Sequence, residues 1–328
     1  DAATGRTNGD EAGGLPSYNE VLAETLSEIS ARDPAVVAIT AAMADGTGLV
    51  GYRQRFPDRF FDVGIAEAHA VCFAAGLAAH RIRPVVAIYS SFLQRAYDQI
   101  IHDVGLQGLP VVFCLDRAGL VGPDGATHHG VFDLSYMRSV PNLVVTAPKD
   151  GDEMRDLLTT ALEQKDRPFA IRYPKTPCVR HTAGSPGRIL PLGSWEVLRE
   201  GEGPCLLAVG SMVDACEKAA ALLEERGIRA AVVNCRFVKP LDRELLLRLR
   251  GEYSLLVTVE ENVIPGGFGA GVHEALAETG ADAKPLFHLG VPDRFVTHGS
   301  RSELLEEVGL TPSRIAARVL EWAAGAEK

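Results

Sequence analysis

The sequence predicts an α/β protein of two domains, each a mostly parallel sheet with helices on both faces. Short runs of β-branched and other apolar residues alternate with helical patterns along the whole chain. These runs are apolar at successive positions, which is typical of parallel strands buried on both sides. The chain has 328 residues, roughly the length of two domains, and a stretch rich in Pro and Gly divides the alternation into two halves.

Regular structure is predicted to begin at Ser17, which forms a helix capping-box pattern with Glu20. Residues 1–17 are rich in Gly and lack hydrophobic periodicity, so we expect a linker there. A first domain is predicted over residues 18–178. Its predicted strands cover 35–40, 84–89, 110–115, 143–147 and 169–173, and its predicted helices begin near Tyr18, Glu67, Phe92 and Gly151.

A second linker is predicted over residues 179–192, where Pro and Gly are frequent and apolar residues are few. Residues 193–328 then repeat the alternation and predict a second domain. Its predicted strands cover 205–210, 230–234, 255–259 and 285–289, its helices lie near 212–226, 242–250 and 267–279, and Thr311 with Pro312 opens a last helix.

The glycine-rich stretch at 263–276 matches neither common nucleotide-phosphate loop. We interpret it as a turn from a strand into a helix. Glu260, Glu261 and Asn262 precede it, and we expect them to cap a helix or to support an interface.

Composition excludes several classes of function. The longest apolar stretch is too short to span a bilayer, and 33 Lys and Arg against 43 Asp and Glu give a net charge of −10, which repels nucleic acid and anionic lipid. The six cysteines lack the spacing of a zinc site, which indicates free thiols in a reducing compartment such as the cytoplasm or a plastid. We expect no nucleic-acid partner, no membrane segment and no metal ligands in this chain.

Glu67 is the first candidate site residue. It lies near the start of a predicted helix made largely of Ala, Val, Leu and Phe. An ionised carboxyl buried there is costly, so we expect its pKa to rise or a partner to pair with it. The alternative is an ordinary acidic residue in a first helical turn, which the helix dipole stabilises.

The chain leaves the strand at 84–89 through Tyr89, Phe92 and Arg95. Ligands of open α/β sheets bind at this carboxyl edge of the strands. Alternatively, Phe92 belongs to the core and Arg95 pairs with Asp98 or Gln99 along its own helix.

The loop DRAGLVGPDGATHHG, residues 116–130, gathers Arg117, Asp124, His128 and His129 after another strand. Loops of this length that carry several ionisable groups are usually functional. A metal site is the rival interpretation of the two histidines, but adjacent histidines rarely chelate one ion together and a third ligand is not evident.

Three arginines, Arg95, Arg117 and Arg172, are predicted at or just past strand ends of the first domain. Guanidinium groups gathered at one sheet edge suit a phosphate or a carboxylate, which predicts an anion site. The alternative is that three arginines fall there by chance.

Eight stretches of the chain resemble one known family. They are AITAAMADGTGL, FPDRFFDVGIAEAHAV, AIYSSFLQRAYDQIIHDV, DRAGLVGPDGATHHGVFDLSY, AIRYP, RFVKPLD, ENVIPGGFGAGV and LGVPDRFVTHGS. They resemble the C-terminal half of 1-deoxy-D-xylulose-5-phosphate synthase, a transketolase-like transferase. The resemblance implies a thiamine pyrimidine-binding domain at 18–178 and a transketolase C-terminal domain at 193–328.

The same resemblance implies thiamine diphosphate and Mg²⁺ as cofactors and a homodimer. The implied reaction decarboxylates pyruvate and joins the remaining two carbons to D-glyceraldehyde 3-phosphate. The products are CO₂ and 1-deoxy-D-xylulose 5-phosphate, a precursor of isoprenoids, thiamine and pyridoxal.

Residue roles also follow from the resemblance. Glu67 matches the glutamate that hydrogen-bonds the aminopyrimidine ring of the cofactor. Phe92 matches the ring packed on the pyrimidine face, and Tyr89 matches an active-site neighbour.

The charged candidates match substrate-binding positions of the family. Arg95, Arg117 and Arg172 match residues that hold substrate anions, and Arg117 and Arg172 are assigned to the phosphate of the aldehyde. Asp124 and His128 match a loop pair that assists the reaction, and His129 is a weaker candidate.

Two features depart from the family pattern. Ala68 follows Glu67 where Gln is expected, which removes a polar contact beside the pyrimidine. The family motif that holds Mg²⁺ and the diphosphate, GDG followed later by Asn, does not occur in these 328 residues. We therefore expect a truncated or cleaved enzyme that needs its N-terminal half, in cis or in trans, to bind the cofactor.

Two alternatives stay open. One is the β-subunit of a split thiamine enzyme such as a 2-oxo acid dehydrogenase, although the arginines and the loop at 116–130 argue against it. The other is a catalytically silent oligomerisation or regulatory module that keeps only the fold.

Overall fold

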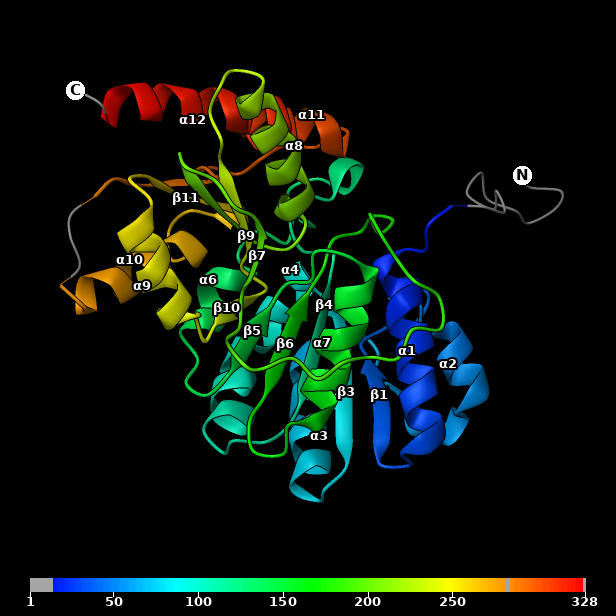
Figure 1. The fold of residues 1–328 in the computed structure, drawn as a ribbon. Helices are drawn as coiled ribbons and strands as arrows, with labels where there is room; N and C mark the ends of the chain where they lie inside the picture. The colour runs from blue at the N-terminus through cyan, green and yellow to red at the C-terminus, as the bar shows by residue number, and fades with distance from the viewer. Residues whose placement is uncertain (1–13, 281–283, 327–328) are drawn as a thin grey trace, which may run out of the picture.

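The computed structural model describes residues 14–280 and 284–326, which form two packed α/β domains (Figure 1). The larger sheet has seven strands in the order β10-β5-β6-β4-β3-β1-β2, and the smaller has five in the order β12-β11-β8-β9-β7. Both are parallel apart from one antiparallel edge strand each, β10 and β7. The predicted fold class is confirmed. Most of the linker predicted at 1–17 lies outside the described residues.

The first domain contains the five predicted strands and, in addition, the short elements β2, α2 and α6, which were not predicted. Its strands are β1 (Val36–Thr40), β2 (Phe60–Asp62), β3 (Arg83–Tyr89), β4 (Val112–Asp116), β5 (Val144–Thr146) and β6 (Phe169–Arg172). Its helices are α1 (Tyr18–Arg32), α2 (Val50–Arg55), α3 (Glu67–Ala79), α4 (Ser90–Leu93), α5 (Tyr97–Gln99), α6 (Asp133–Arg138) and α7 (Gly151–Glu163). The predicted capping box starts α1: the Ser17 hydroxyl accepts from the Glu20 amide, and the Glu20 carboxylate accepts from the Ser17 amide at 2.6 Å.

The helix predicted to begin near Phe92 is broken into short turns. The chain leaves β3 directly into α4, continues through a 3₁₀ turn at Gln94–Ala96 and α5, and ends in a π-helical segment at Ile100–Gly105. Phe92 thus lies in α4 and Arg95 in the 3₁₀ turn. Such irregular helical turns are frequent at functional sites.

The second domain adds two strands that the sequence pattern did not predict. Its strands are β7 (Glu196–Arg199), β8 (Cys205–Ala208), β9 (Ala231–Asn234), β10 (Phe237–Lys239), β11 (Leu256–Val263) and β12 (Leu286–Val291). Its helices are α8 (Met212–Glu224), α9 (Arg243–Glu252), α10 (Phe268–Glu278), α11 (Arg301–Glu307) and α12 (Pro312–Ala326). The unpredicted strands β7 and β10 are short and partly polar, so they leave no apolar run.

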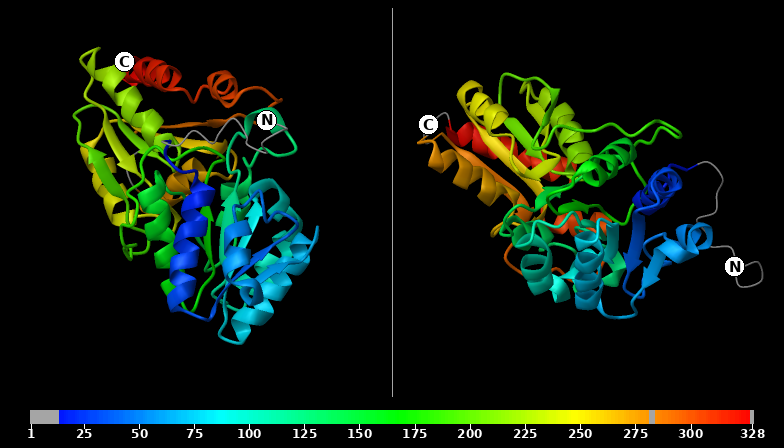
Figure 2. Two further views of the ribbon diagram at one scale, coloured as in Figure 1. Left: turned by 90° about the vertical axis from the view of Figure 1, so that its right-hand side faces the viewer. Right: turned by 90° about the horizontal axis from the view of Figure 1, so that it is seen from below.

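Helices cover both faces of the larger sheet. Seen from below in Figure 2, α1 and α7 lie on one side of this sheet, and α3 lies on the other. In the second domain, α8 packs against α12, and both contribute to a core with the strands of the smaller sheet. No helix among residues 14–280 and 284–326 is long and apolar enough to cross a membrane.

The glycine-rich stretch joins β11 to α10, as predicted. The Glu260 carboxylate accepts from the amides of Phe268 and Gly269 at 2.6 and 2.8 Å and so caps α10. Burial raises the pKa of Glu260 to about 7. Asn262 accepts from the amide of Leu134 in the first domain at 3.2 Å. Both expected roles, a helix cap and an interface contact, are confirmed.

The two domains share an edge of the larger sheet. Strand β10 follows the second linker in sequence, yet it pairs antiparallel with β5, with Phe237 opposite Thr146. Phe237 is fully buried, and its ring lies 6.4 Å from that of Phe169 in β6. The linker predicted at 179–192 contains no helix or strand, and its role as a domain boundary stays a prediction.

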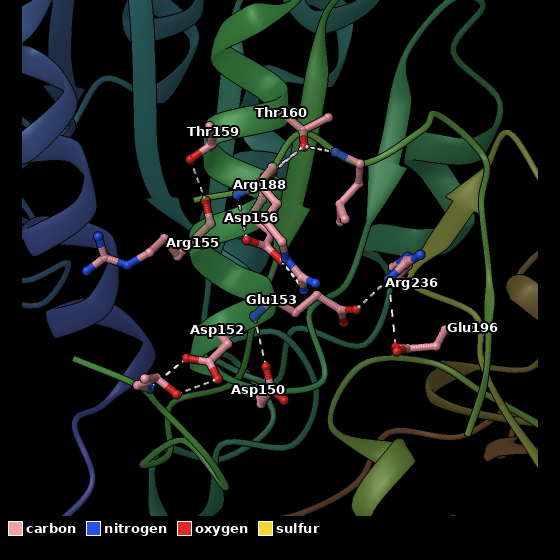
Figure 3. Close-up of polar contacts among 12 residues, drawn as sticks. Asp150, Asp152, Glu153, Arg155, Asp156, Thr159, Thr160, Arg188, Glu196 and Arg236 are labelled. Atoms are coloured by element: carbon pink, nitrogen blue, oxygen red, sulfur yellow. Dashed lines mark hydrogen bonds and ion pairs between the residues drawn. The ribbon is translucent and has the colours of Figure 1, made fainter. Parts of the chain in front are cut away.

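Charged side chains connect the start of α7 to the second domain (Figure 3). Buried Glu153 accepts from the Asn234 amide group at 2.7 Å and pairs with Lys149 at 3.2 Å and Arg236 at 3.4 Å. Lys149 and Arg236 also pair with Glu196 of β7, at 2.9 and 3.7 Å. This network and β10 hold the domains together on the same side of the larger sheet.

Phe237→Ala is expected to lower the free energy of unfolding by about 3–5 kcal/mol, because it leaves a cavity under the shared edge strand. Guanidinium denaturation should show one cooperative transition that shifts as a whole. The matched control is Phe295→Ala, whose ring is 78% exposed and whose loss should cost no more than about 0.5 kcal/mol. Two transitions, of which Phe237→Ala moves only one, would contradict this expectation.

Candidate active site

Glu67 is the first residue of α3, and it is 3% exposed. Arg95 donates from Nη1 to the Glu67 Oε1 at 2.9 Å, while the Arg95 side chain itself is 59% exposed. A partner therefore stabilises the buried carboxyl, one of the two expected outcomes. Arg95 makes this pair rather than the predicted alternative with Asp98 or Gln99. The pair joins a buried carboxylate to an accessible guanidinium.

Aromatic side chains continue from this ion pair. The Arg95 guanidinium carbon lies 5.0 Å from the centroid of the half-buried Phe92 ring. The Phe92 ring centroid lies 5.3 Å from that of Tyr89 and 5.2 Å from that of His128. The Glu67 carboxylate, the Arg95 guanidinium and the half-buried Phe92 ring thus form a continuous series of contacts at the carboxyl end of β3. We call this series of contacting side chains the run.

Arg117 extends the run at the end of β4. Its guanidinium carbon lies 3.5 Å from the centroid of the Tyr89 ring, and it donates to the Gly46 carbonyl at 3.2 Å and to the Asp116 carboxylate. Its φ of 60° is unusual for a residue other than Gly. Asp116 also accepts from the Arg117 amide at 2.6 Å. The Arg117 backbone is thus in a strained conformation, and the contacts with Asp116, Gly46 and Tyr89 hold its guanidinium in place.

Asn19 and Gly46, which support this position, were not predicted as site residues. Asn19 donates from its side chain to the Gly46 carbonyl at 2.9 Å and to the Asp116 carboxylate at 3.0 Å. A Cβ on Gly46 would lie 1.8 Å from the Tyr89 hydroxyl oxygen, so the glycine makes room for Tyr89. Burial raises the pKa of Asp116, although Arg117 and Asn19 oppose the rise.

Asp124 and His128 lie on the loop that follows β4. Asp124 accepts from the Lys175 ammonium at 3.1 Å, and the His128 Nδ1 lies 2.9 Å from the Thr127 hydroxyl. The hydrogen bond from Lys175 holds the pKa of Asp124 below its usual range, and the charges of His128 and Arg117 act in the same direction. Lys175, two residues after the Tyr173 that ends the predicted strand, was not predicted as a site residue.

His129 lies behind the site. It is buried, its Nδ1 accepts from the Val121 amide at 3.1 Å, and its Nε2 lies 2.9 Å from the Thr297 carbonyl of the second domain. This pattern assigns the proton to Nε2. Both ring nitrogens are engaged by the main chain, which agrees with its weaker candidacy.

Arg172 also lies behind the run. It is 4% exposed, its Nε pairs with Asp133 at 3.2 Å, and its Nη2 donates to the carbonyls of Gly130 and Glu261 at 3.2 and 3.0 Å. Its role at the substrate phosphate stays a prediction. The structure brings six other predicted residues into the run, with Asp124 beside them; the six are Glu67, Arg95, Phe92, Tyr89, His128 and Arg117.

Residues 14–280 and 284–326 contain no group of three or more His, Cys, Asp or Glu side chains that could hold a metal ion. The chemistry of the run comes from other groups. A buried carboxylate beside an aromatic face suits a flat nitrogen heterocycle, and the guanidinium groups of the exposed Arg95 and the buried Arg117 suit an anion.

Two family models match the chain. The model "Transketolase, pyrimidine binding domain" matches residues 15–178, and "Transketolase, C-terminal domain" matches residues 193–315. The chain belongs to the transketolase family. This family depends on thiamine diphosphate.

Curated relatives confirm the resemblance to the synthase. The chain is 54% identical over 309 residues to 1-deoxy-D-xylulose-5-phosphate synthase of Thermomicrobium roseum, which covers 94% of this chain and 49% of that protein. It is 53% identical over 305 residues to the synthase of Aquifex aeolicus, an alignment that covers 93% of this chain and 48% of that protein. This transketolase-family chain therefore spans about half the length of the curated relatives it matches.

Solved structures agree with the family assignment. A split-gene transketolase described as an inactive beta4 tetramer is 31% identical, with a TM-score of 0.84 over 95% of this chain and 100% of that one. A transketolase variant from Pichia stipitis, 19% identical with a TM-score of 0.77 over 95% of this chain and 46% of that one, shows the same fold.

Lys175→Met is expected to raise the pKa of Asp124 toward the ordinary value of about 3.9, because it removes the hydrogen bond that lowers it. A carboxyl titration by NMR measures the change. A folded-state pKa below the unfolded one contributes stability above the unfolded pKa and loses it as the pH falls through the folded one. In Lys175→Met, the contribution of Asp124 to the free energy of unfolding should therefore be smaller at neutral pH, and less of it should be lost as the pH falls through the folded-state pKa.

The matched control is Lys218→Met, which removes an ion pair with Asp214 in α8. This variant should leave the titration of Asp124 unchanged. An Asp124 that titrates alike with and without Lys175 would contradict the assigned ion pair.

Proposed function

We propose that the chain forms the pyrimidine-binding and C-terminal domains of a thiamine diphosphate-dependent 1-deoxy-D-xylulose-5-phosphate synthase. The enzyme condenses pyruvate with D-glyceraldehyde 3-phosphate to 1-deoxy-D-xylulose 5-phosphate and CO₂. The observation that carries the proposal is buried Glu67, ion-paired at 2.9 Å with the accessible Arg95 beside the Phe92 ring. Relatives of that name, 51–54% identical to this chain, support it.

The residues present fit the pyrimidine part of thiamine diphosphate. The Glu67 carboxyl would hold a ring nitrogen, and the half-buried Phe92 would pack on the ring face. When bound, thiamine diphosphate would supply a carbon acid whose conjugate base is a nucleophile and a ring that accepts the electron pair left by decarboxylation. Ala68 offers no side-chain hydrogen bond beside Glu67, so Glu67 alone of these two would hold the ring.

Proton handling is assigned to three side chains. Glu67 would exchange a proton with the ring nitrogen of the bound cofactor, and Arg95, which donates to the Glu67 carboxylate at 2.9 Å, would stabilise its ionised form. His128, whose ring packs against Phe92, would give a proton to the oxygen of the acceptor aldehyde as the new carbon–carbon bond forms.

Anion binding is assigned to arginines with different freedom. Arg117 is fixed by Asp116, the Gly46 carbonyl and the Tyr89 ring, so it offers a preorganised charge for the phosphate of the aldehyde. Arg95 is accessible and able to reach the carboxylate of pyruvate. Arg172, buried behind the loop, holds the Gly130 carbonyl and would act on the phosphate from that side.

The remaining parts of the enzyme are assigned by family likeness. Mg²⁺ and the diphosphate would bind on the N-terminal half of the synthase, supplied in cis or by a separate polypeptide. The split-gene neighbour, which has the architecture of this chain at full coverage, supports a supply in trans. We also propose a homodimer, by family likeness. The six free thiols support a reducing compartment such as the cytoplasm.

The proposal is tested by combining the chain with the diphosphate-binding half and supplying both substrates, thiamine diphosphate and Mg²⁺. Stoichiometric CO₂ and 1-deoxy-D-xylulose 5-phosphate are expected. Release of CO₂ without carboligation, or acyl transfer to a lipoyl domain instead, would refute the proposed reaction.

Glu67→Gln is expected to lower kcat by about 10²–10⁴-fold in the complete enzyme, because the amide cannot exchange a proton with the cofactor ring. The matched control is Glu274→Gln, which removes an exposed carboxylate paired with Arg138 at 2.7 Å. Near-normal turnover of Glu67→Gln would refute the assignment of the proton exchange.

Arg117→Ala is expected to raise the KM for D-glyceraldehyde 3-phosphate by about 10–100-fold, the value of a lost charged hydrogen bond, with a smaller effect on pyruvate. Arg226→Ala, at an exposed position, is the control and should change neither constant. An unchanged KM for the aldehyde together with a raised KM for pyruvate would assign Arg117 to the carboxylate instead.

A further inference from the structure

The loop that carries Asp124 and His128 is closed at its base. Gly119 and Gly130 exchange two main-chain hydrogen bonds of 2.7 and 2.8 Å, and we call the residues between them, both ends included, the 119–130 loop. Inside the loop, the Val121 amide donates to the His129 ring. The loop is therefore ordered in part by its own hydrogen bonds, which also include one from the Gly125 amide to the Gly122 carbonyl at 3.2 Å.

An ion pair of the second domain holds the loop beside this base, at Leu120. Glu261, in β11, is fully buried and accepts from the Leu120 amide at 2.7 Å. Arg301, the first residue of α11, donates to the Leu120 carbonyl at 2.7 Å and pairs with both carboxylate oxygens of Glu261. Both main-chain polar groups of Leu120 are thus held by one bidentate ion pair, which the Ser211 hydroxyl completes at 2.8 Å from Glu261.

The carboxylate packs directly on the loop backbone. A Cβ added at Gly119, whose φ is +84°, would lie 2.4 Å from the Glu261 Cδ, so no other residue fits there unchanged. Burial alone would raise the pKa of Glu261, but the Arg301 charge and the hydrogen bonds from Arg301, Leu120 and Ser211 outweigh it, and the pKa lies below its usual range. The pair is ionised at neutral pH.

Further contacts place the same loop against the segment at 297–301. His129 contacts the Thr297 carbonyl at 2.9 Å. A Cβ at Gly122 would lie 3.3 Å from the Gly299 carbonyl oxygen, and a Cβ at Gly125 would lie 3.4 Å from the His298 Cβ. The loop therefore follows the surface of the second domain from Leu120, held by Glu261 and Arg301, to His129, which contacts Thr297.

We propose that the Glu261–Arg301 ion pair positions the 119–130 loop so that Asp124 and His128 meet the substrate. The inference rests on the proposed function and gives the second domain a part in catalysis that requires no contact with cofactor or substrate. Without the pair, the loop populates conformations that do not bind. The apparent affinity then falls in proportion to the competent fraction, while turnover at saturation is kept.

The test uses a double variant, Glu261→Met with Arg301→Met. It removes both charges together, because removal of Arg301 alone would leave an unpaired buried carboxylate that threatens folding. Arg301→Lys serves as the conservative variant, since an ammonium can still pair with Glu261. The matched control is Arg138→Met with Glu274→Met, which removes a different ion pair, of 2.7 Å, that joins α6 of the first domain to α10 of the second.

Two readouts are compared. Amide hydrogen exchange of this chain measures how often residues 119–130 open. Steady-state kinetics of the complete enzyme gives KM and kcat. The double variant should increase exchange of the loop and raise the KM for D-glyceraldehyde 3-phosphate by about tenfold or more, with kcat within about twofold. Arg301→Lys should show smaller increases in loop exchange and in KM than the double variant. The control should change neither loop exchange nor KM.

Two results would overturn the proposal. Loop exchange that is the same in the double variant and the control would show that the pair does not order the loop. A KM that stays constant while the loop opens would show that loop order does not govern substrate binding. Failure of the proposed function is distinguishable, because parent enzyme that forms no product leaves the exchange result intact.

Discussion

Buried charge at the carboxyl edge of the larger sheet is the constraint on which the rest of the structure depends. The parallel strands end there together, and the second domain covers much of that edge, so Asp116, Arg172 and Glu261 are withdrawn from water. An unpaired charge in such a place is prohibitively costly. Each therefore has a partner of opposite sign, and these pairs set how the loop after β4 and the second domain lie against the sheet.

The central strands could be predicted because burial on both faces leaves a continuous apolar run in the sequence. The edge strands β2, β7 and β10 could not, since strands of three or four residues that include a charged side chain carry no such run. The pairing of β10 with β5 joins residues such as Phe237 and Thr146 that are far apart in the chain. Local patterns carry no information about a pairing of that range.

Strand ends indicated which side chains reach the site edge, but not which of them share a space. In the sequence, Arg117 and Arg172 look equivalent. In the structure, the positive φ of Arg117 turns its guanidinium over the Tyr89 ring, whereas Arg172 stays in register with β6 and meets the second domain. Asn19 escaped prediction because its contact with Asp116 spans two elements that only the folded sheet brings together.

The shared strand β10 also has a consequence for synthesis. Until Phe237–Lys239 leaves the ribosome, the outer side of β5 exposes unpaired amide and carbonyl groups, which are a template for strands of other chains. A polypeptide that ends in the segment at 179–192 would keep this open edge permanently. We therefore expect the first domain, expressed alone, to be prone to edge-to-edge association, because β10 of the second domain covers this edge in the whole chain.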